Sequence, residues 1–140
     1  MKSILAVAVF CIHITTAMGY NIYITRSDEL WDAEPEQQIT FKEWKELVDS
    51  TPSLRLDGYA EAGSGEDKIR INQEGLTACL NKEGEIIGWF TYSEGVISCD
   101  GPNDETIKEM YRIAKKLNAD LMGAEGEYYG PDAEVIKNEN

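Results

Sequence analysis

The residue types that most often carry nucleophilic, acid–base or zinc chemistry are scarce in this chain. Its single histidine, His13, lies in a hydrophobic N-terminal segment, so a domain that follows this segment contains none. Ser-His-Asp and Cys-His sites are therefore excluded there, as is a histidine general base near neutral pH. Cys79 and Cys99 alone are too few for a tetrahedral zinc site built on soft ligands. The sequence accordingly predicts no catalytic residue, no metal ligand and no cofactor.

Carboxylates are the abundant groups that remain for chemistry. Glu125 and Glu127 stand two residues apart, so they share a face only in an extended segment, where such a pair could act as acid and base. Residues 28–36 hold five carboxylates and no basic residue, but they lack the ligand spacing and central glycine of an EF-hand loop. We interpret this run as a solvated acidic loop, with calcium binding as the alternative. Neither a P-loop nor a dinucleotide-binding glycine motif is present.

Aromatic residues beside these acids suit a protein interface better than a catalytic site. Tyrosine and tryptophan are enriched where partners meet, and acidic neighbours select a basic partner. For Trp31, packing beneath the acidic loop is slightly favoured over a place in the interface. The candidate binding residues are Asp28, Trp31, Asp32, Glu34, Tyr59, Tyr128 and Tyr129.

The charge of the chain excludes some classes of partner. It has 26 acidic and 13 basic residues, a formal net charge of -13, and its only charged residue before position 26 is Lys2. Such a field repels nucleic acid and anionic membrane surfaces. It favours encounter with basic proteins or cations, although solubility alone is an equally good explanation. We expect a basic protein partner and no nucleic acid.

Periodicity predicts the elements that must position these residues. One helix is expected from Thr40, where Thr40 and Glu43 have capping-box spacing, to the region before Pro52. A second is expected over 104–117, with acids at its start and lysines at its end. Alternation predicts strands at 20–26, 54–62, 68–72, 76–80, 86–92, 96–99 and 120–122. We predict an α+β fold, an antiparallel sheet of about five to six strands with two helices packed on one face.

If the predicted strands pair in the order in which they follow one another, their spacing limits whether Cys79 and Cys99 can form a disulfide. This order puts Cys79 and Cys99 on strands separated by one other, about 9.6 Å apart at twice the strand spacing. A disulfide needs Cα atoms within roughly 7 Å. Two half-buried thiols are therefore favoured over a bridge, although an exported chain would permit one.

Residues 1–19 form a hydrophobic leader with three interpretations. Lys2, the apolar run 4–12 and small residues around Ala17 and Gly19 are typical of a signal peptide, which implies a secreted or periplasmic protein. Alternatively translation starts at Met18 and the protein is cytoplasmic, or the segment is a buried strand. The run is too short to span a membrane, which takes roughly 20 apolar residues. We expect one domain over 20–130 and a flexible tail over 131–140.

Several segments together resemble a family of small uncharacterised bacterial proteins. They are GYNIYITR at 19–26, ITFKEWKELVDSTPSLRLDGYAEA at 39–62, WFTYSEGVIS at 89–98 and DETIKEMYRIAKKLNADLMGAEGEYY at 104–129. The resemblance covers most of the chain after Met18 but implies no catalytic residue. Members begin near the equivalent of Met18, which favours the alternative start, and Cys79 and Cys99 depart from the pattern.

These observations favour a non-catalytic module that binds or inhibits a protein, as immunity proteins do. The alternatives are a carboxylate-based hydrolase that acts on an envelope polymer and a divalent-cation-binding envelope component. The sequence makes no prediction of the oligomeric state.

Overall fold

The structure is a computed structural model of the 140-residue chain and describes residues 20–30 and 32–138. Two α-helices, two short 3-10 helices and ten strands follow one another along these residues. In order they are β1 (Asn21–Thr25), η1 (Pro35–Gln37), α2 (Phe41–Asp49), β2 (Leu54–Leu56), β3 (Tyr59–Ala62), η2 (Gly65–Asp67), β4 (Ile69–Asn72), β5 (Thr77–Leu80), β6 (Ile86–Ser93), β7 (Val96–Asp100), α3 (Asp104–Lys116), β8 (Asp120–Gly123), β9 (Glu127–Tyr129) and β10 (Val135–Asn138).

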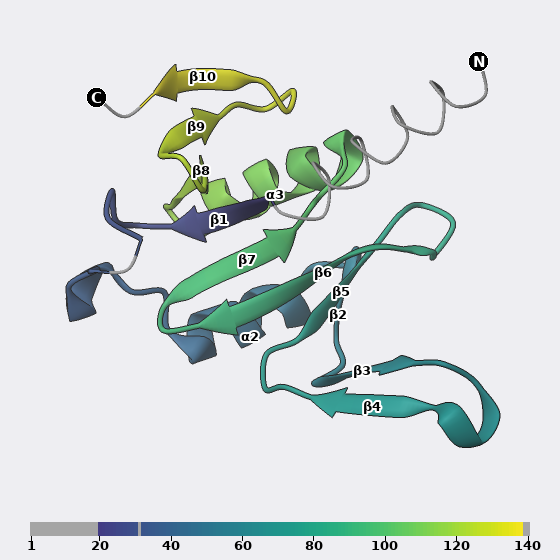
Figure 1. Cartoon of the computed structure of the whole chain (residues 1–140). Helices are drawn as coiled ribbons and strands as arrows, with labels where there is room; N and C mark the ends of the chain where they lie inside the picture. Colours follow the sequence, from purple (N-terminus) through teal and green to yellow (C-terminus); the bar gives the residue numbers. More distant parts are fainter. Residues whose placement is uncertain (1–19, 31, 139–140) are drawn as a thin grey trace, which may run out of the picture.

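An antiparallel sheet organises the fold (Figure 1). Its eight strands lie in the order β10-β9-β8-β1-β7-β6-β5-β2, and β3 and β4 form a separate two-stranded sheet. The α+β class predicted from the sequence is confirmed. The predicted count of about five to six strands is wrong, because one predicted strand divides in two and short strands extend the sheet beyond β8.

The division falls at Gly58, within the strand predicted over 54–62. Gly58 has a φ of 74°, a conformation that glycine adopts at little cost and that ends β2. The amides of Asp57 and Gly58 both donate to the Leu76 carbonyl, and the Gln73 amide donates to the Gly58 carbonyl. The chain therefore leaves the large sheet after β2 and returns to it as β5, with the β3–β4 hairpin projecting between them (Figure 1).

Two short strands complete the opposite edge of the sheet. Strand β9 pairs with β8 and β10, and β10 lies within residues that the sequence assigns to a tail. The Gly130 amide donates to the Glu134 carbonyl and Ala133 has a φ of 66°, so these residues close a hairpin. Three and four residues, partly polar, carry too little alternation to be recognised as strands from sequence.

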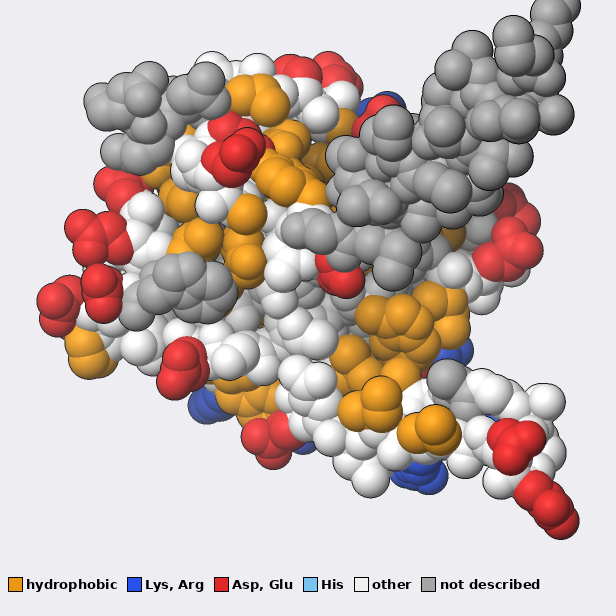
Figure 2. Space-filling model, in the orientation of Figure 1, with side chains coloured by type: hydrophobic (Ala, Val, Ile, Leu, Met, Phe, Trp, Pro, Cys, Tyr) orange, Lys and Arg blue, Asp and Glu red, His pale blue; other side chains and the backbone are white. Residues whose placement is uncertain are grey.

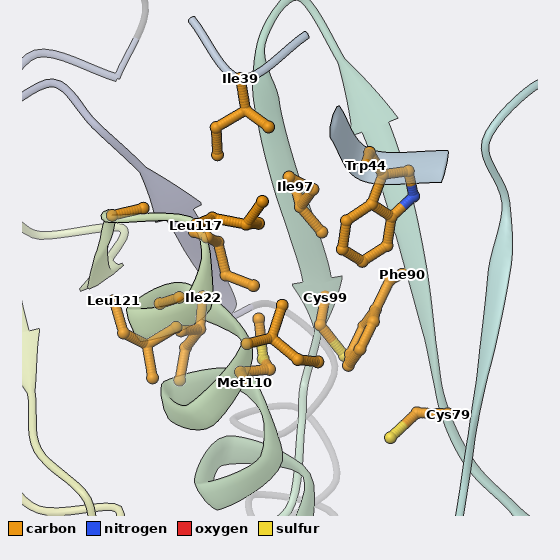
Figure 3. Packing of buried hydrophobic residues seen from close by; sticks show 14 of the residues in the cluster. Ile22, Ile39, Trp44, Cys79, Phe90, Ile97, Cys99, Met110, Leu117 and Leu121 are labelled. Carbon is orange, nitrogen blue, oxygen red and sulfur yellow. The ribbon is translucent and has the colours of Figure 1, made fainter. Parts of the chain in front are cut away.

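The two helices and the sheet share one hydrophobic core. Trp44 of α2 and Met110 of α3 are fully buried and belong to the same cluster as Ile22, Phe90 and Ile97 of the strands (Figure 3). Both helices lie behind the sheet in the view of Figure 1. No described helix is both long enough and apolar enough to cross a membrane.

The predicted capping box begins α2. The Thr40 hydroxyl accepts from the Glu43 amide at 3.0 Å, and the Glu43 carboxylate accepts from the Thr40 amide at 2.9 Å. This reciprocal pair satisfies two backbone donors that a helix start leaves open. It also fixes the Glu43 carboxylate beside Arg26, where a second set of contacts begins.

Arg26 ties the end of β1 to both helices. Its Nη2 lies 2.7 Å from Glu43 Oε2 at the start of α2. Its Nε and Nη2 donate to the Leu117 carbonyl at the end of α3, at 2.9 and 2.8 Å. The hydrogen bond from Arg26 is the main reason that the pKa of Glu43 falls from 4.5 to about 2. One guanidinium thus connects the end of β1 to the start of α2 and the end of α3.

The two cysteines among the described residues are free thiols, as the predicted strand positions imply. Cys79 on β5 and Cys99 on β7 are buried and lie on either side of β6. Burial raises the pKa of the Cys79 thiol to about 12 and that of the Cys99 thiol to about 11. Both thiols are therefore protonated and unreactive in the folded protein.

Candidate protein interface

The structure places the described candidate binding residues in three parts of the fold. Asp28, Asp32 and Glu34 lie in the connector between β1 and α2, and Tyr128 and Tyr129 lie on β9. Tyr59 lies on β3, in the separate hairpin, and does not join either group. Trp31 lies outside the described residues.

A hydrogen bond joins the acidic connector to β9. The Tyr128 hydroxyl donates to Asp28 Oδ1 at 2.7 Å, across a hundred residues of sequence. The connector is shaped locally at Ser27, whose amide donates to the Thr25 hydroxyl and whose own hydroxyl accepts from the Glu29 amide. These Ser/Thr turns direct the chain so that Asp28 meets Tyr128.

Beside this contact lies a small hollow, about 190 Å³ in volume, that we call the aromatic hollow. Its lining comes from α3 and from strands β8, β9 and β10. The lining residues are Tyr111, Lys115, Asp120, Leu121, Tyr128, Tyr129 and Ile136. Ile136 is 57% exposed and its neighbour Val135 is 52% exposed, so the hollow opens beside apolar surface on the edge strand β10.

The acidic connector, which reaches the hollow through Asp28, carries exposed carboxylates. Asp28, Asp32 and Glu34 are exposed. The one cation of the lining, Lys115, lies 3.8 Å from Asp120 and 5.1 Å from the Tyr111 ring centre. Figure 2 shows acidic side chains distributed around one face of the molecule, with few basic ones among them. A basic partner would meet acids here whose charge is mostly uncompensated.

Tyr129 is committed to an internal contact rather than to the surface. Its hydroxyl donates to Glu127 Oε2 at 3.0 Å and lies 3.4 Å from the Tyr20 hydroxyl. Burial, followed by the Glu127 carboxylate, raises the pKa of Tyr129 to about 12. Gly123 leaves room for this cluster, because a Cβ there would overlap the Glu127 carboxylate and the Tyr20 hydroxyl. Tyr129 therefore shapes the wall of the hollow.

The same contacts bear on the carboxylate pair considered for acid–base chemistry. Glu127 is only 9% exposed, and its two oxygens accept from the Tyr129 hydroxyl and the Glu125 amide. Glu125 is exposed in the turn before β9. The two carboxylates do not face each other across a cleft in this arrangement. Within 20–30 and 32–138, no three histidine, cysteine or acidic side chains gather as metal ligands would.

A second hollow contains a polar contact that the sequence did not indicate. It has a volume of about 420 Å³ and lies between the β5–β6 turn and α3. The Ser53 hydroxyl donates to Glu109 Oε2 at 2.6 Å, and Arg112 binds the other oxygen of that carboxylate. Both oxygens of the Glu109 carboxylate are thus engaged within the protein. No spacing rule connects Ser53 with Glu109, so this pair could not be found from sequence.

Comparisons with protein-family models, with curated proteins and with solved structures find no match for the chain. The resemblance to small bacterial proteins therefore stays a prediction, and function rests on the surfaces described above.

Proposed function

We propose that this chain is a non-catalytic, protein-binding or inhibitory module of the immunity type, and that its partner is a basic protein. The observation that carries the proposal is the hydrogen bond from Tyr128 to Asp28. It joins Asp28 of the acidic connector to β9, and we propose that the connector and the aromatic hollow act together as one surface, which we call the connector surface. It consists of Asp28, Asp32, Glu34, Tyr128 and Ile136.

Physical arguments support a basic partner at this surface. Tyrosine and exposed isoleucine supply apolar area at a modest cost in side-chain entropy, and buried tyrosines are common energetic centres of interfaces. The surrounding carboxylates attract a positively charged partner and accelerate encounter. The net charge of -13 extends this attraction beyond the contact itself.

The compartment follows from the leader. We propose a secreted or periplasmic protein if the leader is cleaved near Ala17 and Gly19, and a cytoplasmic one if translation starts at Met18. The connector surface is the same in both cases, because all its residues follow Tyr20. N-terminal sequencing of the protein made by its own host distinguishes the two.

The alternatives receive less support from the geometry. A carboxylate-based hydrolase needs two acids that face each other, whereas Glu125 and Glu127 lie in one turn with Glu127 engaged. A divalent-cation component needs several oxygen ligands converging on one point. Thermal unfolding with and without calcium tests that alternative, since a specific site would raise the melting temperature.

A variant with a matched control tests the proposal. Asp28→Asn, Asp32→Asn and Glu34→Gln together remove three charges, while the amide introduced at position 28 still offers an oxygen to Tyr128. The control variant Glu46→Gln, Asp49→Asn and Glu83→Gln removes three exposed charges elsewhere. Protein captured from the native host by the wild-type chain should be basic and should bind the connector variant about tenfold more weakly. Equal loss in both variants, or capture that salt does not weaken, would contradict the proposal.

A further inference from the structure

The β3–β4 hairpin carries the most exposed large hydrophobic residues of the described chain. Ile69 is 63% and Ile71 is 58% exposed. They stand two residues apart on β4, so they share one face of the hairpin. Ile71 pairs with Ala60 across the strands, which keeps this face apolar on β3 as well. Figure 2 shows hydrophobic side chains along this projecting arm.

The opposite face of the hairpin is polar and its cations are engaged. The Arg70 guanidinium lies 3.9 Å from the centre of the Tyr59 ring. Lys68 Nζ lies 3.4 Å from Glu61 Oε1. Tyr59, one of the candidate binding residues, thus pairs with Arg70 in the hairpin and is not available as a member of the connector surface.

The hairpin also lacks the third strand that such a ribbon ordinarily needs. Strands β3 and β4 pair with each other and with no other described strand. A lone two-stranded ribbon is marginally stable in water, and its outer edges present unpaired backbone donors and acceptors. The edge of β4, where all four residues are exposed, is open to a further strand.

Acids lie before and after β4. Glu66 and Asp67 lie in η2 at the tip of the arm, and Glu74 follows β4. All three are exposed, and none forms an ion pair within the described ranges. We infer that the β3–β4 hairpin is a second docking surface, which takes an extended basic segment of a partner protein as a third strand along β4.

Charge favours a basic segment over a second copy of the chain as the strand that pairs with β4. Two copies paired edge to edge would bring together two molecules of net charge -13, with Glu66, Asp67 and Glu74 near their counterparts. A basic segment supplies the missing strand, covers Ile69 and Ile71 with alternate apolar side chains, and meets these acids with opposite charge. The inference shares the class of partner with the proposed function but not its site.

The test uses a synthetic probe of known chemistry. We expect a peptide of about six residues that alternates valine and lysine to bind the full chain, and a valine–glutamate peptide to bind at least about tenfold more weakly. Hydrogen exchange should show added protection at the amides of Arg70 and Asn72 in the complex, because backbone donors alternate along a strand and the next amide, that of Gln73, already donates toward the β3 side. Equal binding of both peptides would overturn the charge argument, and protection elsewhere would overturn the site. A dimer that already protects β4 without peptide would assign the edge to a second copy.

Variants keep the site falsifiable. Ile69→Thr and Ile71→Thr preserve a β-branched strand residue, so the hairpin should still form, yet peptide affinity should fall about tenfold. Ile86→Thr, which changes an isoleucine that is 44% exposed outside the arm, is the matched control and should leave affinity unchanged. The connector variant should also bind the peptide normally. Unchanged peptide affinity in both arm variants would refute the docking surface on β4 but would not affect the connector surface. If instead the connector variant captures its partner as well as wild type does, only the connector surface is refuted.

Discussion

Replacing Arg26 by glutamine tests whether one side chain holds the sheet and both helices together. Arg26 donates from Nε and Nη2 to the Leu117 carbonyl, a group that the end of α3 leaves without a helical partner. It also donates from both terminal nitrogens to Glu43, at 3.2 and 2.7 Å. Glutamine is too short and uncharged, so we expect both sets of contacts to be lost.

The magnitude follows from the exposure of each partner. A charged donor on a carbonyl contributes roughly 1.5–3 kcal/mol. The Glu43 side chain is 40% exposed, so solvent screening limits the ion pair to about 1 kcal/mol or less. We therefore expect a loss of about 3 kcal/mol in the free energy of unfolding, or a melting temperature lowered by about 10 °C for a domain of this size.

The pH dependence separates the ion pair from the carbonyl contacts. The folded-state pKa of Glu43 is about 2 against an ordinary 4.5. Its contribution is therefore complete above pH 4.5 and is lost as the pH falls toward 2. In Glu43→Gln, which keeps the capping-box pattern, the stability difference from wild type should shrink across this window.

Urea unfolding followed by tryptophan fluorescence provides the assay. Arg26→Gln should cost more than Glu43→Gln, because it alone removes the contacts to Leu117. If the two variants are equally stable, the carbonyl contacts contribute nothing and the reasoning fails. A stability difference between wild type and Glu43→Gln that stays constant down to about pH 2 would refute the ion pair.

Two further predictions concern the core around β6. Cys79 and Cys99 are buried and their thiols have raised pKa values, so in a Cys11→Ser background we expect them to react with a thiol reagent only after unfolding. Fast labelling of the native protein would contradict this packing. Gly88→Ala should cost about 1–2 kcal/mol in calorimetry, because its Cβ would lie 3.1 Å from Thr106 Cγ2. Thr106→Ser removes that methyl, so the double variant should recover part of the loss, and full additivity would show that the clash is not the cause.

Local signals in the sequence predicted local structure well. The spacing of Thr40 and Glu43 identified the start of α2. Glu94 and Gly95, with φ of 50° and 85°, form a tight β6–β7 turn between the strands predicted at 86–92 and 96–99. The positions of Cys79 and Cys99 followed from the strand order. Each of these features depends on residues that are near in sequence or on neighbouring hairpin strands.

The fold departs from the prediction where alternation continues through a turn. The pattern over 54–62 keeps its period through Gly58, so nothing in it signals that β3 leaves the sheet. The candidate interface was predictable only in composition. Asp28 and Tyr128 were both chosen from sequence, but their contact depends on the sheet order, in which only β8 separates β1 from β9. Tyr59 lies apart from them because the chain leaves the large sheet at Gly58.

Because β1 lies inside the sheet and β10 lies at its edge, the two ends of the described chain contribute differently to the fold. Ile22 faces Cys99 on one side and Gly123 on the other, so the first described strand completes its pairing only after β7 and β8 have been synthesised. Such distant pairing slows folding and leaves β1 exposed on the nascent chain. Shortening from the C-terminal side would remove β10, β9 and β8 one edge strand at a time. Trimming into β1 would instead divide the sheet between β7 and β8, so the loss of β1 disrupts the fold more than the loss of an edge strand.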